Sequence, residues 1–274
     1  MQRSLRDVAA ETVRIVEEGI YRAPSGHDVR IAAIVADAVR GTTLVRPGET
    51  DAATWAARER AAVLEVAPET TARAARRLVR EGSAGVAALN FASATHPGGG
   101  FLNGAIAQEE DLARASALYV CLLTQASYYD ANRALRSPLY TDHVIYSPAV
   151  PFFRDHELDL LDEPFAVSIL TAAAPNAREA LRRDGGAGPE ISAALMRRAR
   201  IVLDVAAQRG HRVLVLGAWG CGVFGNDPAD VANIFAHWLA HARFRGAFDR
   251  VVFAVYDRAP GQPSLTAFRD RFCD

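Results

Sequence analysis

The stretch AGVAALNFASATHPGGGFLNGAIAQEEDL, from Ala84 to Leu112, carries the pattern on which the fold prediction depends. Its first part, residues 84–92, is short and almost wholly apolar, which is typical of a strand buried on both faces of a sheet. Three glycines follow at residues 98–100, and the pattern predicts a helix from residue 107. A buried strand that leads through a glycine-rich loop into a helix indicates an α/β protein.

The same alternation of apolar strands and helices recurs along the chain. We predict further strands at 61–67, 143–153, 165–174, 211–219 and 250–257. We predict helices at 68–82, 107–126, 189–210 and 227–243, with a short helix at the end. Because strands of this kind occur in sheets with helices on both faces, we expect a largely parallel sheet. In such sheets, ligands bind beyond the carboxyl ends of the strands.

The N-terminal region has a different pattern. Residues 5–19 have apolar positions near a 3.6-residue period and end in a glycine, which predicts an amphipathic helix. Residues 28–39 fit a strand, with a helix as the alternative. We therefore expect an accessory region at 1–60 that packs on a main domain at 61–274.

Composition excludes several classes of protein. The 274 residues include 31 basic residues, all arginine, and 32 acidic ones, so the net charge of −1 argues against a general nucleic-acid binder. No apolar run approaches the roughly 20 residues of a membrane span, and no signal peptide is evident. The cysteines Cys121, Cys221 and Cys273 are odd in number and lack CxxC spacing, which favours a reducing cytoplasm over a disulfide framework.

A second glycine-rich loop, GAWGCGVFGNDP at residues 217–228, follows another predicted strand. Each loop leads into a helix whose N-terminus favours an anion, so together they suggest a phosphorylated ligand. The loop contains a G-x-G-x-x-G match but no P-loop, and an ordinary turn is an equally good interpretation of the match alone. Phe224 is expected to be exposed there, as a platform for a base or a sugar.

The paired carboxylates Glu109 and Glu110 have two interpretations. They could be a solvated first helical turn, where the helix dipole favours acids. Successive helical residues diverge by about 100°, so as functional groups they would perform different tasks. Gln108 lies four residues before Leu112 and is expected to point toward the buried face of the helix.

The segment GGGFLNGAIAQEE, residues 98–110, resembles the glycine-triplet and Gln-Glu-Glu signature of bacterial-type poly(ADP-ribose) glycohydrolases. The segments VPFFRD, SILTAAAPN and LGAWGCGVFGNDP are also similar to that family, so the resemblance spans roughly residues 60 to 257. It implies a macrodomain-like α/β/α sandwich with a mixed, largely parallel sheet and an N-terminal helical accessory region.

The resemblance also implies the site. Glu110 is expected to be the catalytic acid and Glu109 to hold ribose hydroxyls, while the second loop holds the diphosphate and Phe224 fixes the terminal ribose. The residues expected to contact substrate are Asn90, Gly98, Gly99, Gly100, Asn103, Gln108, Gly217, Gly220, Cys221, Gly222, Val223, Phe224 and Gly225. We expect no metal and no cofactor.

The implied reaction is hydrolysis of the ribose–ribose O-glycosidic bond, in which Glu110 protonates the leaving oxygen and then accepts a proton from water. Adjacent carboxylates cannot lie on opposite faces of one bond, so we expect a single acid/base. The expected partners are poly(ADP-ribose), poly(ADP-ribosyl)ated proteins and the ADP-ribose product, for a cytoplasmic monomer that binds neither a specific nucleic-acid sequence nor a membrane. The resemblance further implies a role in reversing ADP-ribosylation in the DNA damage response.

Alternatives remain at this point. The domain could bind ADP-ribose without cleaving it, or remove single ADP-ribose units from protein or nucleic acid. The G-x-G-x-x-G match suggests a dinucleotide-dependent oxidoreductase. Cys221 could be a nucleophile, although without an evident histidine partner a structural cysteine is the better interpretation.

Overall fold

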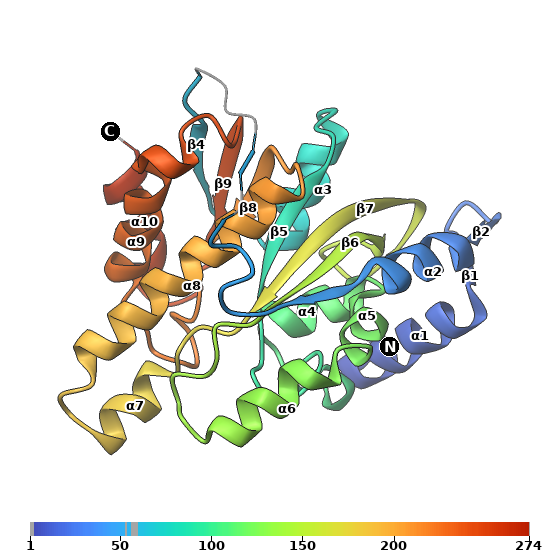
Figure 1. Ribbon diagram of the computed structural model, residues 1–274. Helices are drawn as coiled ribbons and strands as arrows, with labels where there is room; N and C mark the ends of the chain where they lie inside the picture. The colour runs from blue at the N-terminus through green and yellow to red at the C-terminus, as the bar shows by residue number, and fades with distance from the viewer. Residues whose placement is uncertain (1–2, 53, 56–59, 274) are drawn as a thin grey trace.

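A seven-stranded mixed sheet forms the centre of the molecule (Figure 1). The computed structural model describes residues 3–52, 54, 55 and 60–273. The strand order is β3-β6-β7-β5-β8-β9-β4, and the five strands from β7 to β4 are parallel. The strands are β3 (Thr43–Val45), β4 (Val63–Ala67), β5 (Val86–Phe91), β6 (Val144–Arg154), β7 (Leu160–Ala172), β8 (Val213–Leu216) and β9 (Arg250–Ala254). The mixed, largely parallel sheet agrees with the prediction.

Helices cover both faces of this sheet, and successive residues of a strand point to opposite layers. Ala87 and Leu89 of β5 pack into one core with four helices: α7 (Ala177–Arg183), α8 (Gly188–Gln208), α9 (Pro228–Ala240) and α10 (Pro263–Phe272). Val86 and Ala88 pack into the other core, to which all six N-terminal helices contribute. These are α1 (Leu5–Glu18), α2 (Ala32–Gly41), α3 (Thr71–Arg80), α4 (Gln108–Ala115), α5 (Leu118–Leu123) and α6 (Ala126–Leu135). None of the described helices is long and apolar enough to cross a lipid bilayer.

The predicted helix at 107–126 is wrong as one continuous element, because the chain leaves helical geometry at Ser116. That residue is extended, with φ −147° and ψ 179°, and forms an isolated bridge with Phe152. The Ser116 hydroxyl donates to the carbonyl of Leu112 at 2.7 Å and accepts from the amide of Leu118 at 3.2 Å. Pairing with a residue 36 positions away therefore overrides the local helical pattern.

The N-terminal region contributes to the sheet as well as packing on it. Residues 28–39 divide between β2 (Asp28–Arg30), which forms a hairpin with β1 (Ile20–Arg22), and α2. β3 belongs to the predicted accessory region, yet it pairs antiparallel with β6 at one side of the main sheet. A division of the chain at residue 60 stays a prediction. Among the described residues of the first 60, β3 is the segment that belongs to the main sheet.

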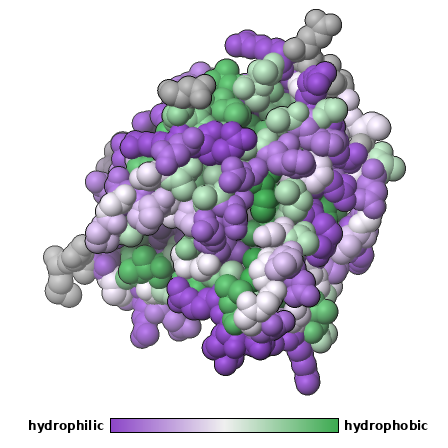
Figure 2. Space-filling model, turned by 90° about the vertical axis from the view of Figure 1, so that its left-hand side faces the viewer, coloured by the Kyte–Doolittle hydropathy of each residue, from purple (hydrophilic) through white to green (hydrophobic). Residues whose placement is uncertain are grey.

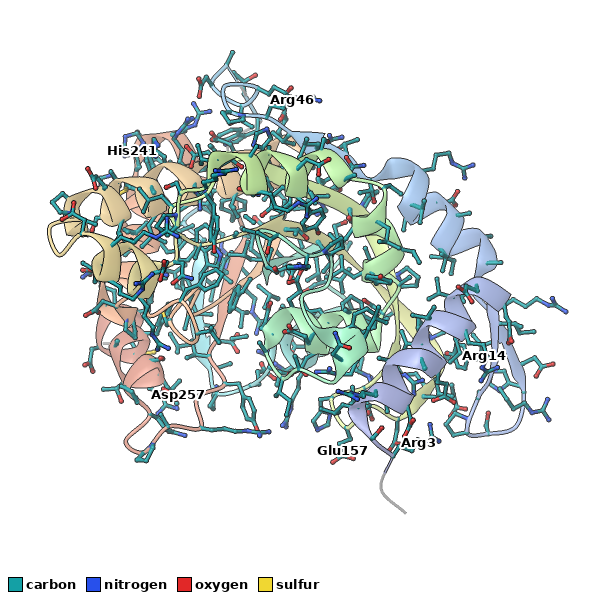
Figure 3. The ribbon with its side chains drawn as sticks, turned by 90° about the horizontal axis from the view of Figure 1, so that it is seen from below. Arg3, Arg14, Arg46, Glu157, His241 and Asp257 are labelled. Atoms are coloured by element: carbon teal, nitrogen blue, oxygen red, sulfur yellow. The ribbon has the colours of Figure 1, made fainter. Side chains whose placement is uncertain are left out.

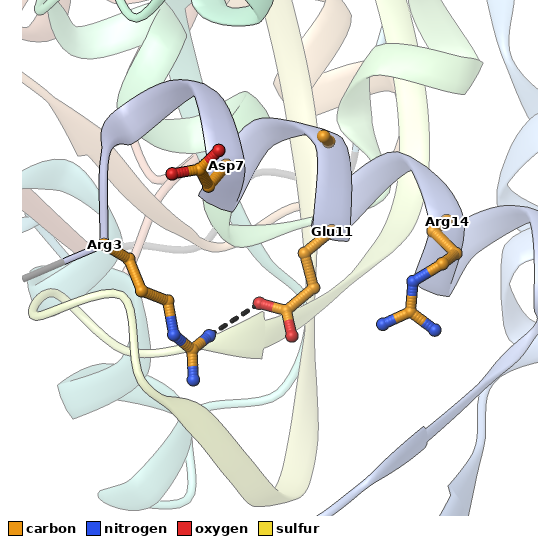
Figure 4. Close-up of a pocket in the computed structure, with 5 residues that line it drawn as sticks. Arg3, Asp7, Glu11 and Arg14 are labelled. Atoms are coloured by element: carbon orange, nitrogen blue, oxygen red, sulfur yellow. Dashed lines mark hydrogen bonds and ion pairs between the residues drawn. The ribbon is translucent and has the colours of Figure 1, made fainter. Parts of the chain in front are cut away.

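Arg154, on β6, anchors helix α1 to the sheet. Its side chain is fully buried, and it donates to the carboxylate of Glu11 at 2.7 Å and to the hydroxyl of Thr12 at 3.1 Å. Arg3 binds the same Glu11 oxygen at 2.7 Å from the surface (Figure 4). This second ion pair lies in a shallow depression on α1, lined by Arg3, Asp7, Ala10, Glu11 and Arg14.

Arg154 and Arg3 bind the same carboxylate, so substituting each in turn compares the buried and the exposed ion pair of α1. Arg154→Met should lower the free energy of unfolding by about 2–4 kcal/mol, since it leaves buried polar groups without a donor. Arg3→Met should cost less than about 1 kcal/mol, because that pair is exposed to solvent. Urea unfolding of the two variants measures the difference, and equal losses would contradict this account of the anchor.

Candidate active site

Three strands bring their carboxyl ends together at one edge of the sheet, which we call the carboxyl edge. Asn90 of β5 pairs with Thr171 of β7, and Ala88 of β5 pairs with Val215 of β8. The loops after β5 and β8 therefore meet at this edge, which Figure 3 shows from below. In that view, Asp257 in the loop after β9 and Arg3 at α1 lie on opposite sides of it.

Gln108 joins the start of α4 to the end of β5. Pairing between β5 and β8 stops at Ala88, and the Gln108 side chain takes up the next backbone groups on β5. Its amide nitrogen donates to the carbonyl of Leu89 at 2.8 Å, and its oxygen accepts from the amide of Phe91 at 2.8 Å. A further bond runs from the amide nitrogen to the hydroxyl of Thr71 at 3.0 Å. All these partners are protein groups, so the geometry gives Gln108 a positioning role rather than a free contact to ligand.

Glu109 is buried, with 2% of its surface exposed. One carboxylate oxygen accepts from Asn90 Nδ2 at 3.2 Å, and the other accepts from the backbone amide of Ser93 at 2.6 Å. Burial raises the pKa of Glu109 to about 8, and the neighbouring Glu110 adds to the rise. The hydrogen bonds from Ser93 and Asn90 act in the opposite direction but do not offset the burial.

Glu110 lies beside Glu109 and retains 8% exposure. One of its oxygens accepts from the backbone amide of Gly100 at 2.9 Å. A Cβ on Gly99 would overlap that oxygen and would lie 3.2 Å from a Glu109 oxygen. Gly99 also has φ 59°, a conformation that favours glycine. The triplet therefore serves close approach of the backbone to both carboxylates, which explains why glycines and acids occur together here.

Asn90 and Asn103 have different environments. Asn90 is fully buried, its nitrogen donates to Glu109 and to Thr171, and its side-chain oxygen has no partner among the described residues. Asn103 is exposed in a 3₁₀ turn (Phe101–Asn103), where its backbone carbonyl accepts from Arg6 of α1 at 2.9 Å. The structure thus brings Asn90 together with Glu109, whereas Asn103 contacts α1 by its backbone.

The second loop packs tightly against neighbouring strands where it leaves β8. A Cβ on Gly217 would overlap the carbonyl of Ala254 at the end of β9, and one on Gly220 would overlap the side chain of Asn226. Asn226 closes the loop, because its nitrogen donates to the carbonyls of Pro175 at 2.8 Å and Gly220 at 3.1 Å. Toward its tip the loop opens, since no atom outside the immediate neighbours approaches the Cβ position of Gly222.

The structure bears on the predicted exposure of Phe224 and on the two interpretations of Cys221. Phe224 is half-buried rather than exposed, because its ring packs 5.9 Å from that of Tyr140. Val223 is the exposed side chain instead, at 71%.

Burial raises the pKa of the Cys221 thiol to about 12, with Asp227 and Asp257 adding to the rise. A thiol with so high a pKa stays protonated, which supports the structural interpretation of Cys221 over the nucleophilic one.

The helix N-terminus after this loop is already occupied. The Asp227 side chain accepts from the amides of Ala229 at 2.7 Å and Asp230 at 3.4 Å. This corrects the expectation that the start of α9 would attract an anion, because a carboxylate of the chain itself lies there. Within the loop, the N–H groups of Cys221, Gly225 and Asn226 already bond to loop carbonyls, so the donors that remain for a ligand include those at residues 222–224.

Tyr256 is a residue at this edge that the sequence did not single out. It follows β9, the residue is 54% exposed, and the guanidinium of Arg258 lies 4.9 Å from the ring centre. The signal in the sequence that could have identified it is an aromatic residue at the end of a predicted strand. Among the described residues, no group of histidine, cysteine or carboxylate side chains is arranged to hold a metal ion.

The raised pKa of Glu109 predicts a pH-dependent stability. A carboxyl group whose pKa is higher in the folded than in the unfolded protein stabilises the fold below its ordinary pKa of about 4.5, and this contribution disappears as pH rises through about 8. The free energy of unfolding of Glu109→Gln minus that of the unmodified protein should therefore be larger at pH 8 than at pH 5, as measured in urea.

Glu179 provides the control for this measurement. Its pKa is lowered to about 2 by Arg182 and Arg183, so it stays ionised at both pH values. The free energy of unfolding of Glu179→Gln minus that of the unmodified protein should therefore be the same at pH 5 and pH 8. A pH-independent difference for Glu109→Gln as well would mean that Glu109 titrates normally.

Comparisons with known proteins agree on one family. A family model described as the catalytic domain of microbial-type PARG, poly(ADP-ribose) glycohydrolase, matches residues 9–155. A search of curated proteins found no match. A solved structure of poly(ADP-ribose) glycohydrolase from Thermomonospora curvata is 53% identical, with a TM-score of 0.93 over 98% of this chain and 99% of that one. The structure of that enzyme bound to the inhibitor ADP-HPD has a TM-score of 0.91 at the same identity and coverage.

A second relative comes from Deinococcus radiodurans. Its poly(ADP-ribose) glycohydrolase, solved in complex with ADP-ribose, is 48% identical, with a TM-score of 0.83 over 89% of this chain and 99% of that one. These likenesses confirm the predicted fold class and the resemblance seen in the sequence. The chain belongs to the microbial-type poly(ADP-ribose) glycohydrolases and is a glycosidase.

Proposed function

We propose that Glu110 is the general acid/base with which this glycohydrolase cleaves the ribose–ribose bond of poly(ADP-ribose) and releases ADP-ribose. One observation carries the proposal. Glu110 retains exposure at the carboxyl edge and has one oxygen fixed by the amide of Gly100, whereas Glu109 is almost wholly buried and has both oxygens bound to protein. Of the two adjacent carboxylates, Glu110 is the one that can reach a bond in a bound substrate.

In the proposed reaction, Glu110 gives its proton to the 2′-oxygen of the leaving unit as the C1″–O bond breaks. The terminal ribose becomes oxocarbenium-like, and water adds to C1″ while Glu110 takes a proton from it. The proton count is thus restored and Glu110 is ready for another cycle. The two carboxylates are neighbours on one helical turn, so Glu109 cannot lie across the bond from Glu110 to form a covalent intermediate.

Glu109 and Asn90 support binding of the terminal ribose in this proposal. The Glu109 carboxyl group accepts from Asn90, Ser93 and Gly98, and the Asn90 side-chain oxygen has no partner among the described residues. Ribose hydroxyls can donate to these acceptors. Burial raises the pKa of Glu109, which disfavours a second negative charge beside Glu110 and the diphosphate.

The second loop is proposed to hold the diphosphate through its backbone N–H groups, with Phe224 against the terminal ribose. The open space around Gly222 and the exposed position of Val223 support a ligand at the tip of this loop. The adenosine of the bound unit then lies toward β9, where Tyr256 offers an exposed ring.

The proposed partners are poly(ADP-ribosyl)ated proteins, with a monomer acting in the cytoplasm and reversing ADP-ribosylation. The relatives supply the chemistry, since the Deinococcus enzyme was solved with ADP-ribose. All three cysteines are free, as a reducing compartment allows.

The first test is product release by a Glu110 variant. With poly(ADP-ribosyl)ated protein as substrate, Glu110→Gln should lower kcat by about 10²–10⁴-fold, because an amide cannot transfer the proton. ADP-ribose is identified by chromatography and mass, and its binding is measured separately by calorimetry. Full activity in Glu110→Gln would remove the assignment of the acid, and tight binding without release in both proteins would indicate a domain that only binds ADP-ribose.

A second test separates close packing from backbone strain in the glycine triplet. Gly99→Ala should lower kcat by about 100-fold, because the new Cβ displaces the Glu110 carboxylate. Gly82→Ala imposes a similar positive φ at a position with no atom within 4 Å, and its kcat should stay within about threefold of the original. Equal losses in the two variants would show that strain alone, and not contact with Glu110, explains the effect.

A further inference from the structure

The ends of α6 and α7 form a rim beside both loops of the site. From α6, Arg133 donates to the carbonyl of Thr95 in the first loop at 2.5 Å. From α7, the backbone amide of Arg178 donates to the carbonyl of Phe224 in the second loop at 2.9 Å. Arg183 of α7 donates to the carbonyl of Arg136 at the end of α6, which joins the two helices. Figure 1 shows α6 and α7 along the lower side of the molecule, where the carboxyl edge lies.

This rim carries positive charge that the protein does not neutralise. Arg182 and Arg183 share Glu179, and Arg133 binds Asp130. Arg136 and Arg178 are exposed, and within the described parts of the chain neither has a carboxylate partner. Arg136 also has φ 52°, a conformation in which glycine is the favoured residue. Two unpaired arginines at the ends of helices that contact the loops stand out in a chain with a net charge of −1.

The strand order indicates which part of a polymer reaches this rim. If the diphosphate lies on the loop after β8 and the terminal ribose lies by Glu110 after β5, the chain beyond the scissile bond continues toward β7 and β6. Helix α7 follows β7, and residues 136–142 lead into β6, whose start pairs with the end of β7 at Thr171. The rim therefore lies on the path of the leaving chain.

We propose that Arg136 and Arg178 bind the phosphates of the leaving units, so that the enzyme holds long poly(ADP-ribose) more tightly than its terminal ADP-ribose unit alone. The inference rests on the proposed function, because it takes the placement of the terminal unit from it. Each leaving unit brings a diphosphate, and guanidinium groups bind phosphate oxygens in a bidentate manner. The rim residues thereby determine preference for chain length and not the chemical step.

The test compares two ligands in the Glu110→Gln background, which keeps polymer intact during binding. Arg136→Ala/Arg178→Ala should weaken binding of purified poly(ADP-ribose) of about ten units at least fivefold more than binding of ADP-ribose. For the polymer, the slope of log K against log salt concentration should become shallower by about 1.4, from two lost contacts at about 0.7 each. The control is Arg80→Ala/Arg245→Ala, two exposed arginines near the opposite ends of the parallel strands, which should leave both affinities unchanged.

Each outcome has a distinct meaning. Polymer affinity that matches the control variant would overturn the rim proposal, and so would an equal loss for both ligands, since the rim would then act on the terminal unit. Failure of the Glu110→Gln protein to bind either ligand would instead contradict the proposed function. Charge reversal with Arg136→Glu/Arg178→Glu should enlarge the selective loss for polymer.

Discussion

Gln108 continues the hydrogen bonding of β5 beyond the point at which β8 stops pairing with it. Through this side-chain amide, the first turn of α4 is fixed to β5, the central strand of the seven-stranded sheet. Glu109 and Glu110 follow directly, so their positions depend on that attachment. Glu109 then binds Asn90 and Ser93, and Glu110 binds Gly100, which ties the first loop to the same framework. One amide thus sets the distance between the sheet, the loop and both carboxylates.

The N-terminal helix supports this arrangement from the other side. Arg6 of α1 binds the carbonyl of Asn103, and Thr12 binds the carbonyl of Arg114 at the end of α4. Arg114 is itself buried and donates to the carbonyl of Ala105. The loop between the glycine triplet and Gln108 is therefore held by contacts to α1 as well as to α4. A segment that the sequence presents as an accessory region is part of what fixes the site.

The sequence predicted the elements whose patterns are local and missed those set by distant contacts. The apolar segments around β5, β8 and β9 gave the sheet, because strands buried on both faces need little context to be recognised. The helix predicted at 107–126 failed at Ser116, where pairing with Phe152 determines the geometry. The glycines and carboxylates were recognised as a group, but the overlap of Gly99 with Glu110 required coordinates. Phe224 was expected to be exposed, but its ring packs on Tyr140. That contact joins segments 84 residues apart, so the local sequence pattern does not show it.

The Asp227 cap on α9 also bears on turnover. Because a carboxylate of the protein already occupies the positive end of that helix, a bound diphosphate gains little from the helix dipole. In the proposed placement of the diphosphate, the second loop recognises it through N–H groups without adding a strong, long-range attraction. An enzyme whose product retains the same diphosphate must let it leave after every cycle. In the proposed placement, the capped helix limits how tightly the product is held and thereby favours exchange of ADP-ribose for the next chain end.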